Sequence, residues 1–371
     1  MKNARLFFIL SFVLVSMTMF GQGLVIPNTN TNYKCEAGRT IGTTHIAITW
    51  NAPGVKGREG KIFGTPLAPY GMNVLGFGST VESPWRAGAD ECTTIAFSTD
   101  VTINGKTLKA GKYAFFIELG AEKSVLIFNS NPNSWGSYFY DASLDVLRVE
   151  VDQQTDVPTS KERLEYTFSN QTPASIEIAL EWEHWRIPFT VEMDVNAHTL
   201  ASIQSQMTGG IGFNGQNLAA AANWCLTNDV NHKQALDWIT RAEDPTLGNK
   251  ASFNTLSTKA GLLTKLGETE KAEKAMMKAV EIGNSFELHG YGRQLLAQKK
   301  VDEAMNVFQT NYDRHQGAWP TNVGLMRGYS AKGDLKKALK YAKIAHQNAP
   351  DPLNKNNLES CIKTFESGKP I

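Results

Sequence analysis

Four side chains in the first half of the chain are suited to hold an anionic or sugar-like ligand: Arg58, Trp85, Arg86 and Glu91. Pro84 and Gly88 bracket the Trp-Arg pair, so both side chains are expected on a loop that leads into a strand. A guanidinium beside an indole can stack on a ligand or grip a carboxylate with two hydrogen bonds. The alternative is architectural, with Arg86 paired to Asp90 or Glu91 and Trp85 filling one end of the core.

A second set of residues has the chemistry for acid–base work. Glu181 and Glu183 flank Trp182. On a strand, both carboxylates would lie on the face opposite the indole, roughly 7 Å apart. Paired carboxylates can cleave a glycosidic bond. The competing interpretation is that both are solvated charges on the outer face of a sheet.

No cofactor or metal site is predicted, and no catalytic residue is assigned. The run from Gly210 to Gly215 has the G-x-G-x-x-G spelling of a dinucleotide loop, but the preceding residues have a helical pattern and no βαβ unit follows. We interpret this run as a connection between helices. The seven histidines include no i, i+4 pair, and the chain has neither a C-x-x-C nor a G-x-S-x-G motif.

The four cysteines allow two expectations. In an oxidising compartment, with each half of the chain holding its own bridge, the pairs would be Cys35–Cys92 and Cys225–Cys361. The first pair would need Cα atoms within about 7 Å of each other. The alternative is four packed thiols, because free cysteine is among the most buried residue types.

Strands must position the first two sets of residues. From Tyr33 to about Val195, short runs of alternating apolar and polar residues are separated by turn residues. Asn104-Gly105 lies between two such runs and predicts a tight hairpin. The strand after Gly111 is expected to have one dry and one wet face, and the Gly-rich residues 72–80 are expected to form a looped excursion. About nine strands predict an antiparallel β-sandwich or barrel over residues 24–195.

Short motifs within this region occur in a recognisable order. They include Ile41-Gly42-Thr43-Thr44, Pro69-Tyr70-Gly71, Trp85-Arg86, Thr93-Thr94, Ala110-Gly111 and Trp135-Gly136. Through these motifs, residues 33–192 resemble a secreted bacterial family catalogued as domain of unknown function 2911. The sequence departs from the family pattern in a longer Gly-rich insertion between Gly71 and Trp85, and at Asp90, where Asn is usual. The resemblance implies a secreted β domain and brings no established reaction, cofactor or catalytic residue.

Residues 196–371 have the hydrophobic period of helices. Four small residues each follow a short polar turn, at intervals of 37, 32 and 34 residues: Ala235, Ala272, Ala304 and Ala338. Small residues repeated near every 34 positions resemble tetratricopeptide repeats. Such units bury their faces by stacking, so residues 355–366 are expected to form a terminal capping helix. The prediction for this half is an α-helical repeat solenoid.

The first 23 residues have the features of a secretory signal peptide. Lys2 and Arg5 precede an apolar run over residues 6–20, and small residues follow at 21–23. The apolar run is too short to span a bilayer comfortably. The chain has 37 basic and 36 acidic residues, a balance that offers no broad attraction for nucleic acid or an anionic membrane surface. We therefore expect a protein exported to the periplasm or beyond, with no membrane span.

Two function classes fit these observations. The leading one is a non-catalytic binding or scaffolding protein, whose β domain holds a small anionic or carbohydrate ligand and whose repeats bind a protein or peptide. The alternative is an extracytoplasmic glycan hydrolase that uses carboxylates of the β domain. An enzyme needs an acid, a base and aromatic residues in one cleft, and nothing in the sequence requires that convergence.

Overall fold

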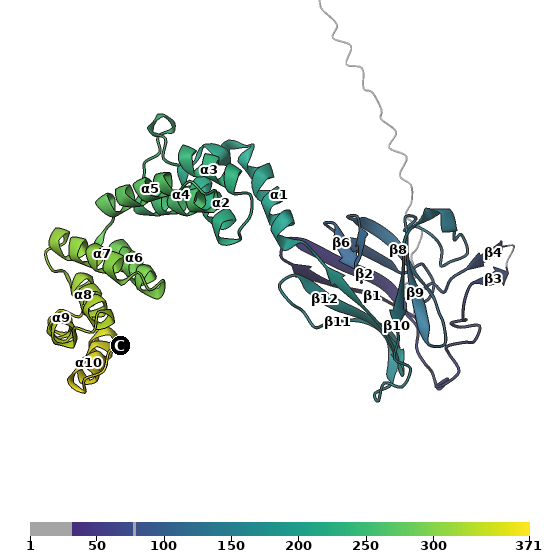
Figure 1. Cartoon of the computed structure of the whole chain (residues 1–371). Helices are drawn as coiled ribbons and strands as arrows, with labels where there is room; N and C mark the ends of the chain where they lie inside the picture. The colour runs from purple at the N-terminus through teal and green to yellow at the C-terminus, as the bar shows by residue number, and fades with distance from the viewer. Residues whose placement is uncertain (1–31, 77–78) are drawn as a thin grey trace, which may run out of the picture. The chain divides into compact units, whose positions relative to one another are not determined.

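A computed structural model describes residues 32–76 and 79–371. These residues divide into two compact units, one ending at Met193 and the other beginning at Asp194 (Figure 1). The first unit is built of strands and the second of helices. The predicted signal peptide, residues 1–23, lies outside the described residues.

The β unit contains two larger antiparallel sheets and a two-stranded ribbon. The six-stranded sheet has the order β1-β2-β5-β8-β9-β10, the five-stranded sheet has the order β11-β12-β13-β6-β7, and the ribbon pairs β3 with β4. The strands are β1 (Tyr33–Ile41), β2 (Thr44–Ala52), β3 (Asn73–Gly76), β4 (Ser79–Ser83), β5 (Thr94–Phe97), β6 (Val101–Ile103), β7 (Lys106–Leu108), β8 (Gly111–Glu118), β9 (Lys123–Asn129), β10 (Asp145–Asp152), β11 (Lys161–Ser169), β12 (Ser175–Glu183) and β13 (Trp185–Glu192). The predicted antiparallel β class is confirmed.

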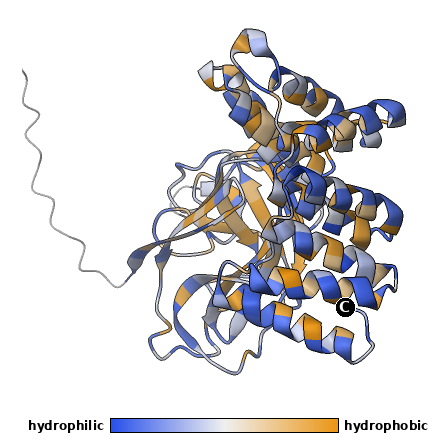
Figure 2. Ribbon diagram, turned by 90° about the vertical axis from the view of Figure 1, so that its left-hand side faces the viewer, coloured by the Kyte–Doolittle hydropathy of each residue, from blue (hydrophilic) through white to orange (hydrophobic). Residues whose placement is uncertain are grey.

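Aromatic side chains fill the space between the two larger sheets. The Phe115 ring on β8 lies 5.7 Å from the Phe189 ring on β13, and the Trp50 ring on β2 lies 5.1 Å from the Tyr166 ring on β11. Offset and edge-on contacts of this kind add to the free energy gained by burying the rings. Figure 2 shows hydrophobic residues running along the strands of this unit. The two sheets therefore face each other across a shared aromatic core.

The expectation of a wet face on the strand after Gly111 is wrong. Both Phe115 and Phe116 on β8 are 1% exposed. The reason is that β8 is an interior strand, and the face opposite the core is covered by the segment that follows β9, from which Tyr140 packs edge-on against Phe116. A central strand covered on both faces loses its alternation of dry and wet residues.

The turns follow the local sequence. Asn104-Gly105 connects β6 to β7 with φ angles of 44° and 82°, so the predicted hairpin is confirmed. The Gly-rich segment predicted as a looped excursion instead contributes the ribbon, in which Asn73 pairs with Ser83 and Val74 with Glu82.

The helical unit contains ten α-helices among the described residues. They are α1 (Val195–Met207), α2 (Gly215–Thr227), α3 (His232–Arg241), α4 (Phe253–Lys265), α5 (Thr269–Ile282), α6 (Ser285–Ala297), α7 (Val301–Arg314), α8 (Trp319–Ala331), α9 (Leu335–Gln347) and α10 (Pro352–Glu366). Helices α2 to α9 pack as consecutive pairs, and α10 packs on α9. The helical-repeat prediction and the capping helix are confirmed, with the latter beginning three residues earlier than expected.

Small residues allow the repeat helices to approach closely. Ala235, Ala272, Ala304 and Ala338, the four positions that carry the repeat pattern, are all buried at 0–6% exposure. The dinucleotide-like run forms a short 3-10 turn at Gly210–Phe213 and then begins α2 at Gly215. It therefore connects two helices, as predicted.

The predicted disulfides are wrong, because all four cysteines lie in the described residues and are free thiols. Cys35 on β1 pairs across from Trp50 on β2, whereas Cys92 precedes β5 on the other side of β2. Two strand spacings separate β1 from β5, about 10 Å, which exceeds the reach of a disulfide. Cys225 and Cys361 belong to different apolar clusters, around α2–α3 and around α9–α10.

Candidate ligand-binding site

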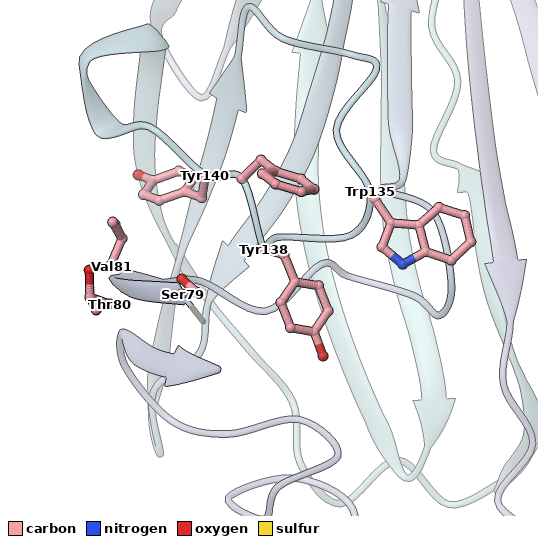
Figure 3. Close-up of a pocket in the computed structure, with 7 residues that line it drawn as sticks. Ser79, Thr80, Val81, Trp135, Tyr138 and Tyr140 are labelled. Atoms are coloured by element: carbon pink, nitrogen blue, oxygen red, sulfur yellow. The ribbon is translucent and has the colours of Figure 1, made fainter. Parts of the chain in front are cut away.

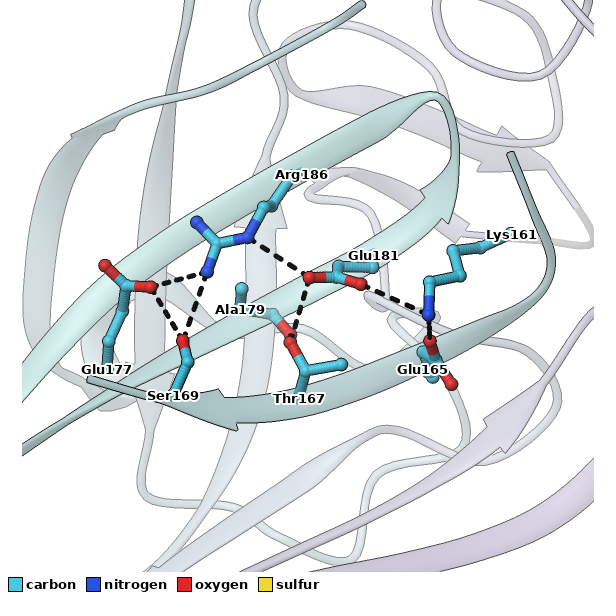
Figure 4. Close-up of polar contacts among 8 residues, drawn as sticks. All are labelled: Lys161, Glu165, Thr167, Ser169, Glu177, Ala179, Glu181 and Arg186. Carbon is cyan, nitrogen blue, oxygen red and sulfur yellow. Dashed lines mark hydrogen bonds and ion pairs between the residues drawn. The ribbon is translucent and has the colours of Figure 1, made fainter. Parts of the chain in front are cut away.

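The carboxylate of Glu181 lies in a polar network on the outer face of the five-stranded sheet (Figure 4). The Arg186 guanidinium joins Glu181, through Nε at 3.1 Å, to Glu177, through Nη2. Lys161 Nζ lies 3.6 Å from the other Glu181 oxygen, and the Thr167 hydroxyl donates a hydrogen bond of 3.0 Å. Both oxygens of Glu181 are therefore engaged by neighbours on the same sheet.

The same network changes the acidity of Glu177. Burial would raise the pKa of this carboxyl, but hydrogen bonds from Arg186 and Ser169 outweigh burial and lower it. A carboxylate held ionised between fixed donors is a poor general acid, because an acid must keep a proton near neutral pH. The polar contacts on this face of the sheet therefore have a structural role.

Glu183 does not share the surroundings of Glu181. The β12–β13 hairpin turns at Glu183 and His184, and Glu183 has the left-handed φ of 55°. Its side chain is 5% exposed, and one carboxylate oxygen accepts a hydrogen bond from the backbone N–H of Gly60. Because the turn reverses the chain here, the prediction that both glutamates are solvated charges on one face is wrong.

A cavity of about 770 Å³ opens beside this hairpin turn. Its acidic and imidazole side chains are Glu59, Asp156, Glu183 and His184, and its aromatic side chains are Phe63, Tyr70 and Trp185. Phe63 and Trp185 stack with centroids 4.1 Å apart. The backbone carbonyl of Val157 lies 2.7 Å from His184 Nδ1, which orients the imidazole. Glu183 and His184 thus bring a carboxyl group and an imidazole, two groups that can transfer protons, to one cavity.

The structure separates the four residues predicted as one ligand site. Trp85 is 5% exposed, stacks parallel to Trp182 at 6.2 Å and contacts Phe63 edge-on. Its backbone also exchanges two hydrogen bonds with Ile117. These contacts match the architectural alternative for Trp85, a side chain that fills the core.

Both arginines donate hydrogen bonds to backbone carbonyls of the loops in which they lie. Arg86 Nη1 donates to the backbone carbonyl of Asp90 at 2.8 Å, and its guanidinium lies 5.3 Å from the centre of the Tyr138 ring. Arg58 donates to the carbonyls of Gly54 and Val55, at 2.7 and 2.9 Å. Arg86 thus contacts Asp90 through the backbone and not through the expected carboxylate.

Glu91 lines a smaller cavity of about 210 Å³. Its Oε2 accepts a hydrogen bond of 2.6 Å from the Asn51 side chain. Lys112 also lines this cavity, whereas Arg58, Trp85 and Arg86 do not. A ligand role for the four residues stays a prediction, and the structure offers a different aromatic surface nearby.

That surface is a cavity of about 780 Å³ beside the loop that follows β9 (Figure 3). Seven residues line it: Ser79, Thr80, Val81, Trp135, Tyr138, Phe139 and Tyr140. Trp135 is 53% exposed and Phe139 is 70% exposed, and both line this one cavity, so their exposed apolar surface is grouped. Among the residues that the structure describes, no charged side chain lines this cavity. The lining combines aromatic surface with hydroxyl groups from β4 and from the tyrosines.

Local contacts fix the loop that carries these aromatic residues. Gly136 has a φ of 56°, and a Cβ there would lie 2.5 Å from Arg86 Nη1. Tyr140 is anchored by a 2.6 Å hydrogen bond from its hydroxyl to Asp145, and burial followed by this contact raises the pKa of the phenol. The sequence signal for this site is the group of four aromatic residues within positions 135–140, none of which is among the predicted ligand-binding residues.

The fold defines a class of protein in which an antiparallel β unit precedes a stack of helical repeats. Residues 33–191 match the model of the family described as "Protein of unknown function (DUF2911)", which confirms the resemblance carried by the sequence motifs. A matching solved structure is described as "Crystal structure of YrrB: a TPR protein with an unusual peptide-binding site", with 19% identity, a TM-score of 0.29, and coverage of 44% of this chain and 83% of that chain. No curated protein matches.

Two further searches concern the described residues alone. Within 32–76 and 79–371, no three or more His, Cys, Asp or Glu side chains are grouped so that they could hold a metal ion. None of the helices in the described part of the chain is long and apolar enough to cross a membrane.

Proposed function

We propose that the protein is a non-catalytic binding protein whose β unit holds a carbohydrate chain on the aromatic cavity around Trp135 and Phe139, and whose helical unit binds a peptide segment of a partner. The observation that carries the proposal is the exposure of these two rings in a cavity whose described lining residues are all uncharged. A sugar ring offers C–H faces to aromatic rings and hydroxyls to Ser79 and Thr80. An uncharged cavity of this kind contains no acid or base for chemistry.

The experiment is affinity electrophoresis of the full chain through gels that contain a soluble neutral polysaccharide. We expect retardation of the wild type, and at least ten-fold weaker retardation for Trp135→Ala, since losing about 1.4 kcal/mol of stacking and contact lowers affinity ten-fold. Phe213→Ala is the matched control, because Phe213 is a 67% exposed aromatic residue of the helical unit outside this cavity. Equal retardation of wild type and Trp135→Ala would refute the site.

Glu183 supports a second candidate function, hydrolysis of a glycan. Its buried carboxylate lines the 770 Å³ cavity together with His184 and the Phe63–Trp185 stack. Glycoside cleavage uses a pair of carboxyl groups, and Glu59 and Asp156 line the same cavity as Glu183. Release of reducing ends from a polysaccharide, lost in Glu183→Gln and kept in Glu192→Gln, would favour this candidate over the binding protein, because Glu192 is an exposed glutamate of β13 that does not line the cavity.

Export is the remaining element of the proposal. The basic residues Lys2 and Arg5 ahead of the apolar run support removal of residues 1–23 during secretion. N-terminal sequencing of the protein recovered from the periplasm or culture medium should begin near Gln22 to Leu24. A cytoplasmic product that starts at Met1 would contradict export.

A further inference from the structure

The helical unit contains a cavity of about 410 Å³ lined by residues of α6, α8 and α10. Its charged and polar side chains come mainly from the first two of these helices: His289 and Arg293 on α6, and Trp319 and Arg327 on α8. Apolar side chains, including Val323, Met326 and Leu358, line the same cavity.

Arg327 is a half-buried cation without a counter-charge in the described part of the chain. Its Nε is buried and has no hydrogen-bond partner. Burial lowers the pKa of Arg327, and the nearby Arg293 lowers it further. The opposing effect comes from the Cys361 side chain and not from a carboxylate. Other cations of this unit have partners: Lys259 lies 2.7 Å from Glu243, and Lys265 lies 2.7 Å from Asp229. Neither Arg327 nor the nearby Arg293 has such an ion pair among the described residues.

Two more residues that line the cavity have a buried polar atom without a partner among the described residues. They are His289, at Nδ1, and Trp319, at Nε1. A buried polar group without a partner destabilises the fold by about 1–3 kcal/mol, and a buried unpaired charge by more. Because these two atoms have almost no accessible surface, a ligand in the cavity would interact with the charges of Arg327 and Arg293. An anion there would offset the cost of the unpaired Arg327 charge.

We propose that this cavity binds a carboxylate of a partner peptide, held by Arg327 and Arg293, while an adjacent apolar side chain of the peptide packs on Val323 and Leu358. The inference rests on the proposed peptide binding by the helical unit and specifies its chemistry. Guanidinium groups hold carboxylates through paired, charge-assisted hydrogen bonds, and both Arg327 and Arg293 line this cavity. The apolar lining explains why the ligand is a peptide and not a free inorganic anion.

The test measures the affinity of the full chain for four N-acetylated leucyl-X-leucine tripeptides by isothermal titration. X is glutamate or glutamine, and each peptide has either a free or an amidated C-terminus. Comparing the four affinities shows whether the cavity binds a side-chain carboxylate or the carboxylate of the C-terminus. We expect at least one charged peptide to bind ten-fold or more tightly than the uncharged glutamine amide.

Two variants link this preference to the cavity. Arg327→Met should abolish the preference and also raise the Tm of the free protein, because an unpaired buried cation is replaced by an apolar side chain. Lys363→Gln removes the same charge from an exposed position on α10 and should leave the preference unchanged.

The outcomes separate this site from the proposed function. Equal binding of all four peptides, or a preference that survives in Arg327→Met, overturns the carboxylate site and leaves peptide binding in place. Binding of none of the four peptides overturns both.

Discussion

Most of the charged and aromatic residues that the sequence suggested for a functional site are occupied by contacts within the protein. Arg58, Arg86 and Glu181 all have protein partners, and Trp85 is core. The sequence identifies such residues by type, but it does not reveal whether a neighbour in space already satisfies them. That information depends on pairings between distant strands.

The first prediction concerns Arg86. Replacing it with alanine removes a hydrogen bond from a charged donor to the Asp90 carbonyl and the cation–π contact with Tyr138. We expect a loss of about 2 kcal/mol in the free energy of unfolding. Denaturant titration measures this loss, and Lys56→Ala, an exposed cation of the same unit, should change stability by less than about 0.5 kcal/mol. If Arg86→Ala changes the free energy of unfolding as little as the control does, Arg86 is not structural, and the result would favour its predicted role as a ligand contact.

His289 gives the helical unit a specific pH dependence. Burial and, to a lesser extent, the nearby Arg327 and Arg293 lower the pKa of His289 to about 4. The unfolded chain takes up this proton near its ordinary pKa of about 6.5, whereas the folded chain does so only near 4. The folded state therefore loses stability as pH falls from 6.5 to 4, by up to about 3 kcal/mol.

The measurement is the free energy of unfolding of wild type and His289→Gln at intervals between pH 7 and pH 4. The difference between the two proteins should shrink or reverse toward pH 4, because the variant has no imidazole to protonate. Parallel curves would show that His289 titrates normally in the folded protein.

At the level of elements, periodicity predicted more than residue type did. The alternation after Tyr33 and the small residues near every 34 positions indicated the two kinds of unit and the capping helix. The surroundings of each element were harder to predict. The two covered faces of β8 and the turn at Glu183 depend on segments more than twenty residues away in the chain, which leave no mark on the local pattern.

Two glycines on α6 provide a matched test of helix packing. A Cβ at Gly292 would lie 2.3 Å from the Phe308 ring on α7, whereas nothing lies within 4 Å of a Cβ at Gly290. Gly292→Ala should destabilise the helical unit by about 1–3 kcal/mol through overpacking. Gly290→Ala should stabilise it by about 0.5–1 kcal/mol, because alanine favours a helix over glycine. Thermal unfolding followed by circular dichroism at 222 nm compares them, and equal shifts would contradict the packing.

At the scale of the whole molecule, the division near Met193 predicts that the β unit folds without the helices. Residues 24–193 expressed alone should be soluble and unfold in one cooperative transition. Denaturant titration monitored by tryptophan fluorescence checks this expectation. If the fragment aggregates while the full chain stays soluble, the helices complete the β core and the two units are not independent.

The central claim is that the β unit binds a glycan at its exposed aromatic cavity and leaves it intact. Isothermal titration of a neutral hexasaccharide into the full chain tests both parts at once, because binding releases heat that ends at saturation, whereas hydrolysis releases heat as long as substrate remains. We predict a saturable isotherm for wild type, weakened at least ten-fold by Trp135→Ala and unchanged by Glu183→Gln. Continuous heat release that disappears in Glu183→Gln would contradict the claim and identify the protein as a hydrolase.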